Sequence, residues 1–143
     1  MSADGYVNAK SWKSQVVRMA ASLHEGVDLQ SSVEAVAGMF YWSGEATRLI
    51  SEYEEFFYSG KREDSLAASE QLKYPNLLVL TKGDERLILL FNETEKPVKI
   101  DLNNKNLKPG QCASVFGSSE KVSSPEKMSV TVDAGDVAAI YIK

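Results

Sequence analysis

Residues 86–92 read RLILLFN, and this stretch decides the fold class of the chain. Its apolar side chains fall at odd and even positions alike, so a strand built from them is apolar on both faces. A turn sequence, Lys82-Gly83-Asp84, precedes the stretch, and polar residues at 93–96 follow it. The stretch therefore predicts a central strand that is covered on both sides.

Five more strands are predicted around this central one. They lie at residues 76–81, 97–102, 111–116, 128–132 and 137–142. The Pro109-Gly110 pair, a serine-rich loop at 117–127 and the tight turn at 133–136 separate the later strands. Short strands at this spacing are typical of sandwiches and barrels. We therefore expect residues 75–143 to form a six-stranded antiparallel β-sandwich.

The first half of the chain has helical periodicity instead. Apolar residues recur at helical intervals over 11–25, where Ser11 can cap the helix, and again over 46–59. The apolar run at 36–42 is too short for a typical helix and predicts one buried strand. The predicted fold class is α+β, with a helical segment at 1–65 that contains this strand, followed by the sandwich.

Composition and charge narrow the classes of function. The net charge of −4 and the scattered basic residues argue against nucleic-acid binding. No apolar run reaches the roughly 20 residues that span a bilayer, and the start of the chain lacks the pattern of a signal peptide, so a cytoplasmic location is the default expectation. One cysteine, Cys112, and one histidine, His24, give neither an internal disulfide nor a metal cluster, and we expect no cofactor.

Several sequence features resemble the β-sandwich that follows the (β/α)8 barrel in amylase-like and β-galactosidase-like glycoside hydrolases. In the second half these features are LLFNET at 89–94, PV at 97–98, PG at 109–110, VF at 115–116 and DAGDVA at 133–138. In the first half, residues 35–45 and the helix that ends in EEFF at 54–57 resemble the last strand, loop and helix of such a barrel, and SWK at 11–13 resembles the start of the preceding helix.

The resemblance implies an accessory module rather than a complete enzyme. A whole barrel takes about 250 residues, and most of one is missing from this chain. The expected function is to brace a catalytic barrel, which would be the rest of the enzyme or a partner chain, and to contact carbohydrate. The alternative is a self-contained, non-catalytic module for protein interaction or dimerisation.

Glu45 is the candidate catalytic residue, because on the barrel interpretation it follows the end of a strand, where barrel enzymes place their active sites. The alternative is a charge in the first turn of a helix, where the helix dipole favours it. Tyr41 and Trp42 are candidates for stacking on sugar rings, against an alternative role in core packing. His24 fits a charge at a helix end, and Cys112 fits an inert buried thiol.

Two further features have alternative interpretations. Tyr53, Phe56 and Phe57 lie on one stripe of the helix predicted at 46–59. This stripe is either the seam between helix and sheet or an interface with a partner, which includes a homodimer. Residues 92–94, NET, match a glycosylation sequon, but we expect them to form only a turn.

Overall fold

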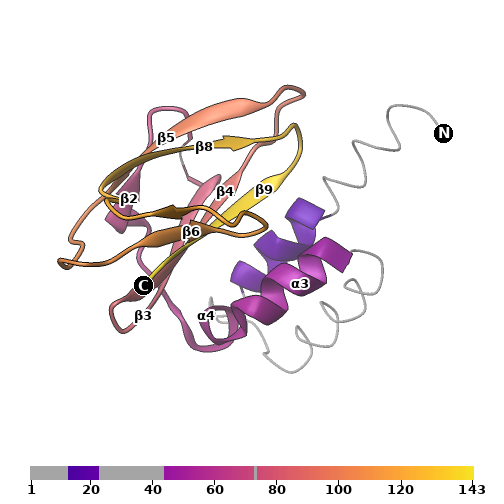
Figure 1. Ribbon diagram of the computed structural model, residues 1–143. Helices are drawn as coiled ribbons and strands as arrows, with labels where there is room; N and C mark the ends of the chain where they lie inside the picture. Colours follow the sequence, from indigo (N-terminus) through magenta and orange to yellow (C-terminus); the bar gives the residue numbers. More distant parts are fainter. Residues whose placement is uncertain (1–12, 23–43, 73) are drawn as a thin grey trace.

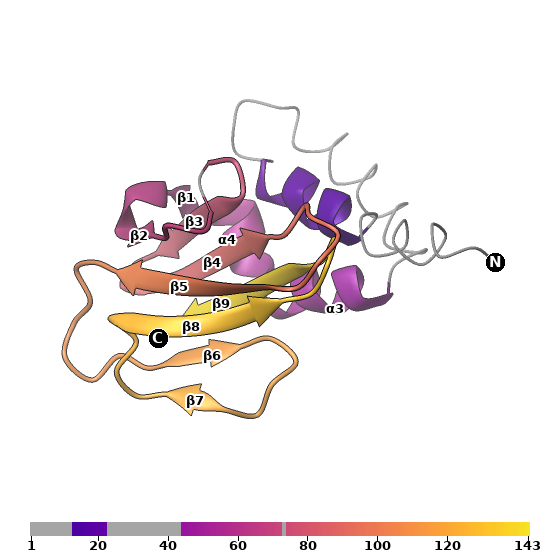
Figure 2. The ribbon, with the colours of Figure 1, turned by 90° about the horizontal axis from the view of Figure 1, so that it is seen from above.

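The computed structural model describes residues 13–22, 44–72 and 74–143 (Figure 1). Two antiparallel sheets pack face to face, and a layer of helices lies against the outer face of the larger sheet (Figures 1 and 2). The α+β fold class and the antiparallel sandwich predicted from the sequence are therefore confirmed. Among the described helices, none has the length and hydrophobicity needed to cross a membrane.

The larger sheet has the strand order β1-β3-β4-β9-β6-β7. Its strands are β1 (Lys61–Arg62), β3 (Leu77–Lys82), β4 (Glu85–Phe91), β9 (Val137–Ile142), β6 (Ala113–Val115) and β7 (Lys121–Val122). Strand β4 pairs with β3 on one side and with the C-terminal strand β9 on the other, in registers that place Leu87 opposite Leu80 and Tyr141. The stretch that decides the fold class is thus a central strand.

The smaller sheet has the order β2-β5-β8, formed by β2 (Ala67–Ala68), β5 (Val98–Asn104) and β8 (Lys127–Val132). In β5 and β8, buried and exposed side chains alternate, with Ile100 opposite Val130 on the inner face. One face of this sheet closes the sandwich and the other faces solvent. The alternation of apolar and polar residues along the strands predicts this arrangement.

Strand β4 separates two hydrophobic clusters. Leu87, Leu89 and Phe91 pack with the helices, whereas Ile88 and Leu90 point into the sandwich and pack with the smaller sheet. All five side chains are fully buried, because the strand has a layer on each face. The double cover that the sequence predicts for this strand is confirmed.

The helical layer contains a helix at residues 13–21, then α3 (Gly44–Glu52) and α4 (Glu54–Ser59), and a short 3-10 helix, η1 (Asp64–Leu66), follows β1. The single helix predicted at 46–59 is therefore wrong in one respect, because it breaks at Tyr53. There φ is −115° and ψ is 30°, and the Tyr53 carbonyl accepts from the N–H of Phe56 at 2.9 Å. The break turns the Tyr53 ring onto Phe116 and Tyr141 of the sheet.

Three short strands were missed by the sequence prediction. Strands β1, β2 and β7 have two residues each, and all lie at the edges of their sheets. Two residues are too few to show a period, so only pairing with a longer strand defines them. The predicted strand at 36–42 lies outside the described residues, and the division into segments 1–65 and 75–143 stays a prediction.

Candidate functional site

Two features of the helix–sheet junction bear on function: the contacts that attach the helix at 13–21, and a pocket at the break between α3 and α4. Arg18 makes several of the polar contacts that attach the helix. Its guanidinium lies 3.9 Å from the centre of the Phe91 ring and donates to the side chains of Asn76 at 2.9 Å and Glu93 at 3.1 Å, and to the carbonyl of Pro75. Burial lowers the pKa of Arg18 from its usual value, although nearby Glu93 opposes that effect. A cation over an aromatic face with charge-assisted bonds fixes this helix on the sheet.

Lys13 and Glu45 form a second attachment. The buried Lys13 ammonium lies 2.9 Å from the carboxylates of both Glu45 and Asp136, and so links the first helix, α3 and the β8–β9 turn. Burial acts to lower the pKa of Lys13, but hydrogen bonds to the two carboxylates outweigh burial and raise it. Glu45 therefore has a structural partner in the first turn of α3, although its side chain is 69% exposed. Its catalytic assignment stays a prediction.

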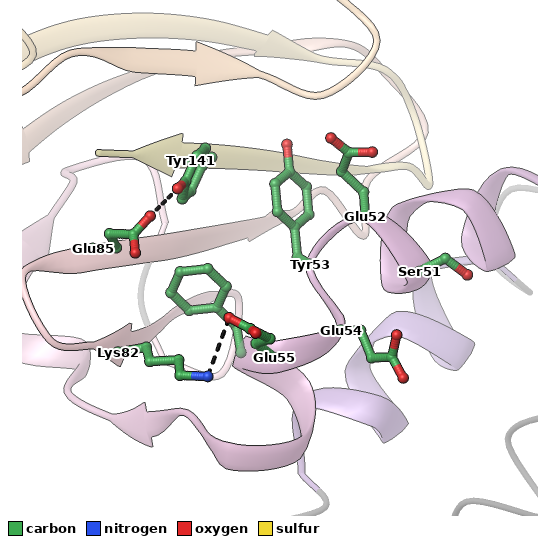
Figure 3. A pocket seen from close by; sticks show the side chains of 9 residues that line it. Ser51, Glu52, Tyr53, Glu54, Glu55, Lys82, Glu85 and Tyr141 are labelled. Carbon is green, nitrogen blue, oxygen red and sulfur yellow. Dashed lines mark hydrogen bonds and ion pairs between the residues drawn. The ribbon is translucent and has the colours of Figure 1, made fainter.

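The pocket has a volume of about 370 Å³ and opens beside the α3–α4 break (Figure 3). Its walls come from the junction of the two helices and from three strands, which supply Lys82 of β3, Glu85 of β4 and Tyr141 of β9. The antiparallel pairing of Lys82 with Glu85, and of β4 with β9, brings these residues together. The site thus joins segments that lie far apart in the sequence.

Aromatic rings form the floor of this pocket. The Tyr141 ring centre lies 5.6 Å from that of Tyr53 and 5.9 Å from that of Phe56, and the ring of Phe56 meets Tyr141 edge to face. Tyr53 is 8% exposed and Phe56 is 6% exposed. Edge-to-face rings with their bodies buried give a firm apolar base for the polar groups above them.

Carboxylates surround the two tyrosine hydroxyls. Tyr141 donates a hydrogen bond to the Glu85 carboxylate, and burial together with this bond raises the pKa of Tyr141 well above its usual value. Burial and the nearby charge of Glu52 also raise the pKa of Tyr53. Both hydroxyls therefore stay neutral at physiological pH and keep their protons for hydrogen bonding.

The charge of the pocket is negative. Four glutamates and one lysine line it, and the lysine, Lys82, lies 3.1 Å from the carboxylate of Glu55. Figure 3 shows the Glu52 side chain beside Tyr53, whereas the Glu54 carboxylate points away from the tyrosines. Within the described part of the chain, no group of three potential metal ligands gathers, so the acidic groups do not form a recognisable metal centre.

The other predicted site residues fall into two groups. Tyr53, Phe56 and Phe57 are buried inside this chain, against the larger sheet. A partner interface through them would require them to become exposed, and that assignment stays a prediction. Tyr41, Trp42 and His24 lie outside the described residues.

Cys112 is exposed, so the expected buried thiol is wrong. Its backbone exchanges two hydrogen bonds with the last residue, Lys143, just before β6 begins. The Cys112 side chain is therefore uncovered at this end of the sheet. The alternation of its apolar neighbours in the sequence could not predict this exposure.

The sequon at 92–94 lies in the connection between β4 and β5, where Asn92 is buried and Glu93 and Thr94 are exposed. Asn92 is 2% exposed, and its side-chain amide donates to the carbonyls of Lys96 at 2.8 Å, Val132 at 3.0 Å and Asp133 at 3.1 Å. Its amide oxygen accepts from Thr94. A side chain with its nitrogen enclosed in this way holds the β4–β5 turn against the β8–β9 turn.

Sequence reasoning missed the pocket itself. The sequence predicts Lys82 only as a turn residue and Tyr141 only as one position of a strand, and it assigns Glu85 to no element. The signal that was present is the acidic run at 52–55, EYEE, in which Tyr53 of the apolar stripe lies between carboxylates. Only the strand register shows that Glu85 and Tyr141 meet this run.

No protein-family profile matches the sequence, and no curated protein matches it. Solved structures, in contrast, are similar to this chain in fold. An α-amylase from Geobacillus thermoleovorans, solved in complex with acarbose, is similar over 73% of this chain and 23% of its own, with 13% identity and a TM-score of 0.50. An α-amylase from Anoxybacillus is similar over 71% of this chain and 22% of its own, with 20% identity and a TM-score of 0.49.

A glycoside hydrolase family 30 xylanase from Clostridium acetobutylicum is also similar, over 70% of this chain and 28% of its own, with 13% identity and a TM-score of 0.45. The chain spans about a quarter of the length of these enzymes. At these identities the likeness concerns the fold alone. The fold of this chain is similar to that of part of the Geobacillus α-amylase, and the resemblance expected from the sequence is confirmed at the level of the fold.

Proposed function

We propose that this chain is the bracing end of a glycoside hydrolase, in which the sandwich holds the last helices of a (β/α)8 barrel in position. Catalysis would then need the rest of the barrel, on the same polypeptide or on a partner chain. On this proposal the chain has a structural role. A glycosidase needs two carboxylates at a set separation across its substrate, and the chain would not supply this pair by itself.

The helical layer is the observation that carries the proposal. Val16, Val17, Leu49 and Phe57 from three helices share one hydrophobic cluster with the outer face of the larger sheet. At roughly 25 cal/mol per Å² of apolar surface, such side chains supply most of the free energy that holds the layers together. Arg18 and Lys13 add the polar contacts that fix the first helix in one orientation.

Turnover by the isolated chain is the test of the missing active site. We expect the pure protein to hydrolyse neither 4-nitrophenyl α-glucoside nor 4-nitrophenyl β-xyloside above the uncatalysed rate. Turnover that disappears in a folded Glu45→Gln variant would contradict the proposal and would make Glu45 a catalytic carboxylate. Circular dichroism of the variant controls for the loss of its ion pair with Lys13.

Carbohydrate contact is the finer part of the proposal, and it rests on the predicted stacking residues Tyr41 and Trp42. The apolar faces of sugar rings pack on aromatic side chains. We expect maltohexaose to change the tryptophan fluorescence of the chain saturably, and Trp42→Ala to abolish the change. A Trp12→Phe variant is the control, and its response should match that of the original chain.

The alternative function, a self-contained interaction or dimerisation module, predicts a surface built on Tyr53, Phe56 and Phe57. All three side chains are buried against the sheet, so nothing in their arrangement favours this alternative. It remains a prediction that sedimentation over a range of concentrations would test.

A further inference from the structure

We propose that the pocket at the α3–α4 break binds a primary ammonium group carried by a small ligand. The proposal is independent of the bracing role, because it rests only on the geometry and charge of the described residues around this cavity. Three features carry it: the converging carboxylates, the aromatic floor with an unpartnered tyrosine hydroxyl, and the ammonium group that the chain already places at the rim.

The first feature is the convergence of carboxylates on the two tyrosines. Glu85 accepts a hydrogen bond from Tyr141, and the charge of Glu55 also acts on that hydroxyl. Glu52 acts in the same way on Tyr53. Like charges gathered around a concave, partly buried surface create a negative potential, which concentrates cations and excludes anions.

The second feature is the floor. The rings of Tyr53, Phe56 and Tyr141 present aromatic surface beneath the carboxylates, and a cation near such a ring is attracted by its quadrupole. Tyr53 is 8% exposed as a residue and lines the pocket, and no hydrogen bond joins its hydroxyl to another residue in the described part of the chain. This oxygen is free to accept from the N–H of a ligand.

The third feature is Lys82. Its ammonium group lies 3.1 Å from Glu55 at the rim, so the pocket already accommodates this chemical group. Lys82 satisfies one carboxylate and leaves the pocket with a net negative charge. A ligand ammonium group near Glu52 and Tyr53 would balance the remaining negative charge of the pocket. It would also be repelled by Lys82, so removing that lysine should strengthen binding.

A calorimetric titration of the full chain at pH 7 tests the proposal with three probes. The first two are 1,5-diaminopentane and a β-1,4-linked glucosamine trimer, which carry the ammonium group on an aliphatic chain and on a sugar. The third is the N-acetylglucosamine trimer, which has the same sugar rings without the charge. We expect at least one amine to bind saturably, and about tenfold more tightly than the neutral trimer.

The two amines distinguish the source of the group. Tighter binding of the diamine indicates an aliphatic amine, and tighter binding of the glucosamine trimer indicates an amino sugar. Either outcome supports the proposal. Absence of saturable binding of both amines up to about 10 mM would overturn it, and so would equal affinity for the neutral trimer.

Three variants connect binding to the pocket. Glu52→Gln and Tyr53→Phe should each weaken amine binding several-fold, and Lys82→Met should strengthen it. Glu54→Gln is the matched control. It removes the same charge two residues from Glu52, at a lining residue whose carboxylate points away from the tyrosines. Equal weakening by Glu54→Gln and Glu52→Gln would contradict a directed site and would leave only a diffuse surface charge.

Discussion

Several buried polar side chains tie loops to strands. Asn92 joins two turns, and Arg86, 5% exposed, donates from β4 to the carbonyls of Lys105 at 2.8 Å and Leu66 at 3.3 Å. A buried donor of this kind supplies hydrogen bonds to backbone carbonyls of partly buried loops. Removing it takes one hydrogen bond from each of these carbonyls, and the Leu66 carbonyl then keeps the N–H of Lys105 as its donor.

Asn92→Ala should lower the free energy of unfolding by about 2–4 kcal/mol, because three backbone carbonyls each lose one hydrogen bond at once. Urea denaturation of the full chain measures the change. Asn103→Ala is the control, since Asn103 is exposed on β5, and we expect a change within about 0.5 kcal/mol. Equal effects of the two substitutions would mean that the turn network contributes nothing.

Asp64 gives the chain an acid-sensitive contact. Burial favours its neutral form, but hydrogen bonds from Arg62 at 2.7 and 3.0 Å and from the N–H of Val79 at 2.8 Å outweigh burial and lower the pKa of Asp64. The ionised form is thus favoured in the folded state. Its stabilising contribution is present above about pH 4, the unfolded pKa, and is lost as the pH falls through the lower folded pKa.

Asp64→Asn should accordingly lower the free energy of unfolding by about 1 kcal/mol at pH 7, and the difference should shrink below about pH 4. Thermal melts at several pH values measure both effects. The control is Asp84→Asn, because Asp84 and its partner Lys108 are each 63% exposed, and we expect little difference at any pH. A difference for Asp64→Asn that stays constant down to pH 2 would contradict this assignment.

At the level of residues, the sequence could predict the turn at Asn92 and the strand at 86–92, but not the pocket. Alternation identifies which side chains are buried, because burial follows the period of the strand. It does not identify which strand lies beside another. Glu85 and Tyr141 meet only because β4 pairs with β9 in one particular register. That register depends on the packing of both sheet faces, which no local pattern contains.

The helices depend on the sheet for their stability. Helix α4 has six residues and α3 has nine, and helices this short are marginal in water without tertiary packing. Phe57 of α4 is completely buried in the cluster shared with the sheet, whereas its neighbour Tyr58 is 39% exposed. The contrast within one helix separates the effect of packing from that of helix propensity.

Phe57→Ala should lower the free energy of unfolding by about 3–5 kcal/mol, because it leaves a cavity between helix and sheet. Tyr58→Ala should change it by less than about 1 kcal/mol. Denaturant titration of the two variants measures the difference. Similar values for both would mean that α4 does not contribute its packing to the stability of the chain.

The sequence could predict the longer elements because each shows its period over several residues. The break between α3 and α4 had no such signal, since 46–59 reads as one continuous apolar stripe. Packing against the sheet determines the break, because Tyr53 packs on Phe116 and Tyr141 only when the helix turns there. Likewise, the edge strands β1, β2 and β7 exist because a longer neighbour offers free backbone groups.

At the scale of the whole molecule, the larger sheet is the common wall of two cores. One core joins it to the helices and the other joins it to the smaller sheet. A change at the wall should therefore reach the layer that the side chain faces. Leu87 and Ile88 are adjacent, fully buried and directed to opposite sides, which makes them a matched pair for this test.

Hydrogen exchange along the purified chain, for the original sequence and for Leu87→Ala, tests the shared helix–sheet core most directly. A shared core predicts slow exchange at 13–21 and 44–59, with opening free energies close to those of β4 and β9. Leu87→Ala should lower protection of the helices more than Ile88→Ala does. Fast exchange of the helices beside a protected sandwich would contradict a shared core, because the sandwich would then not hold the helices that it is proposed to brace.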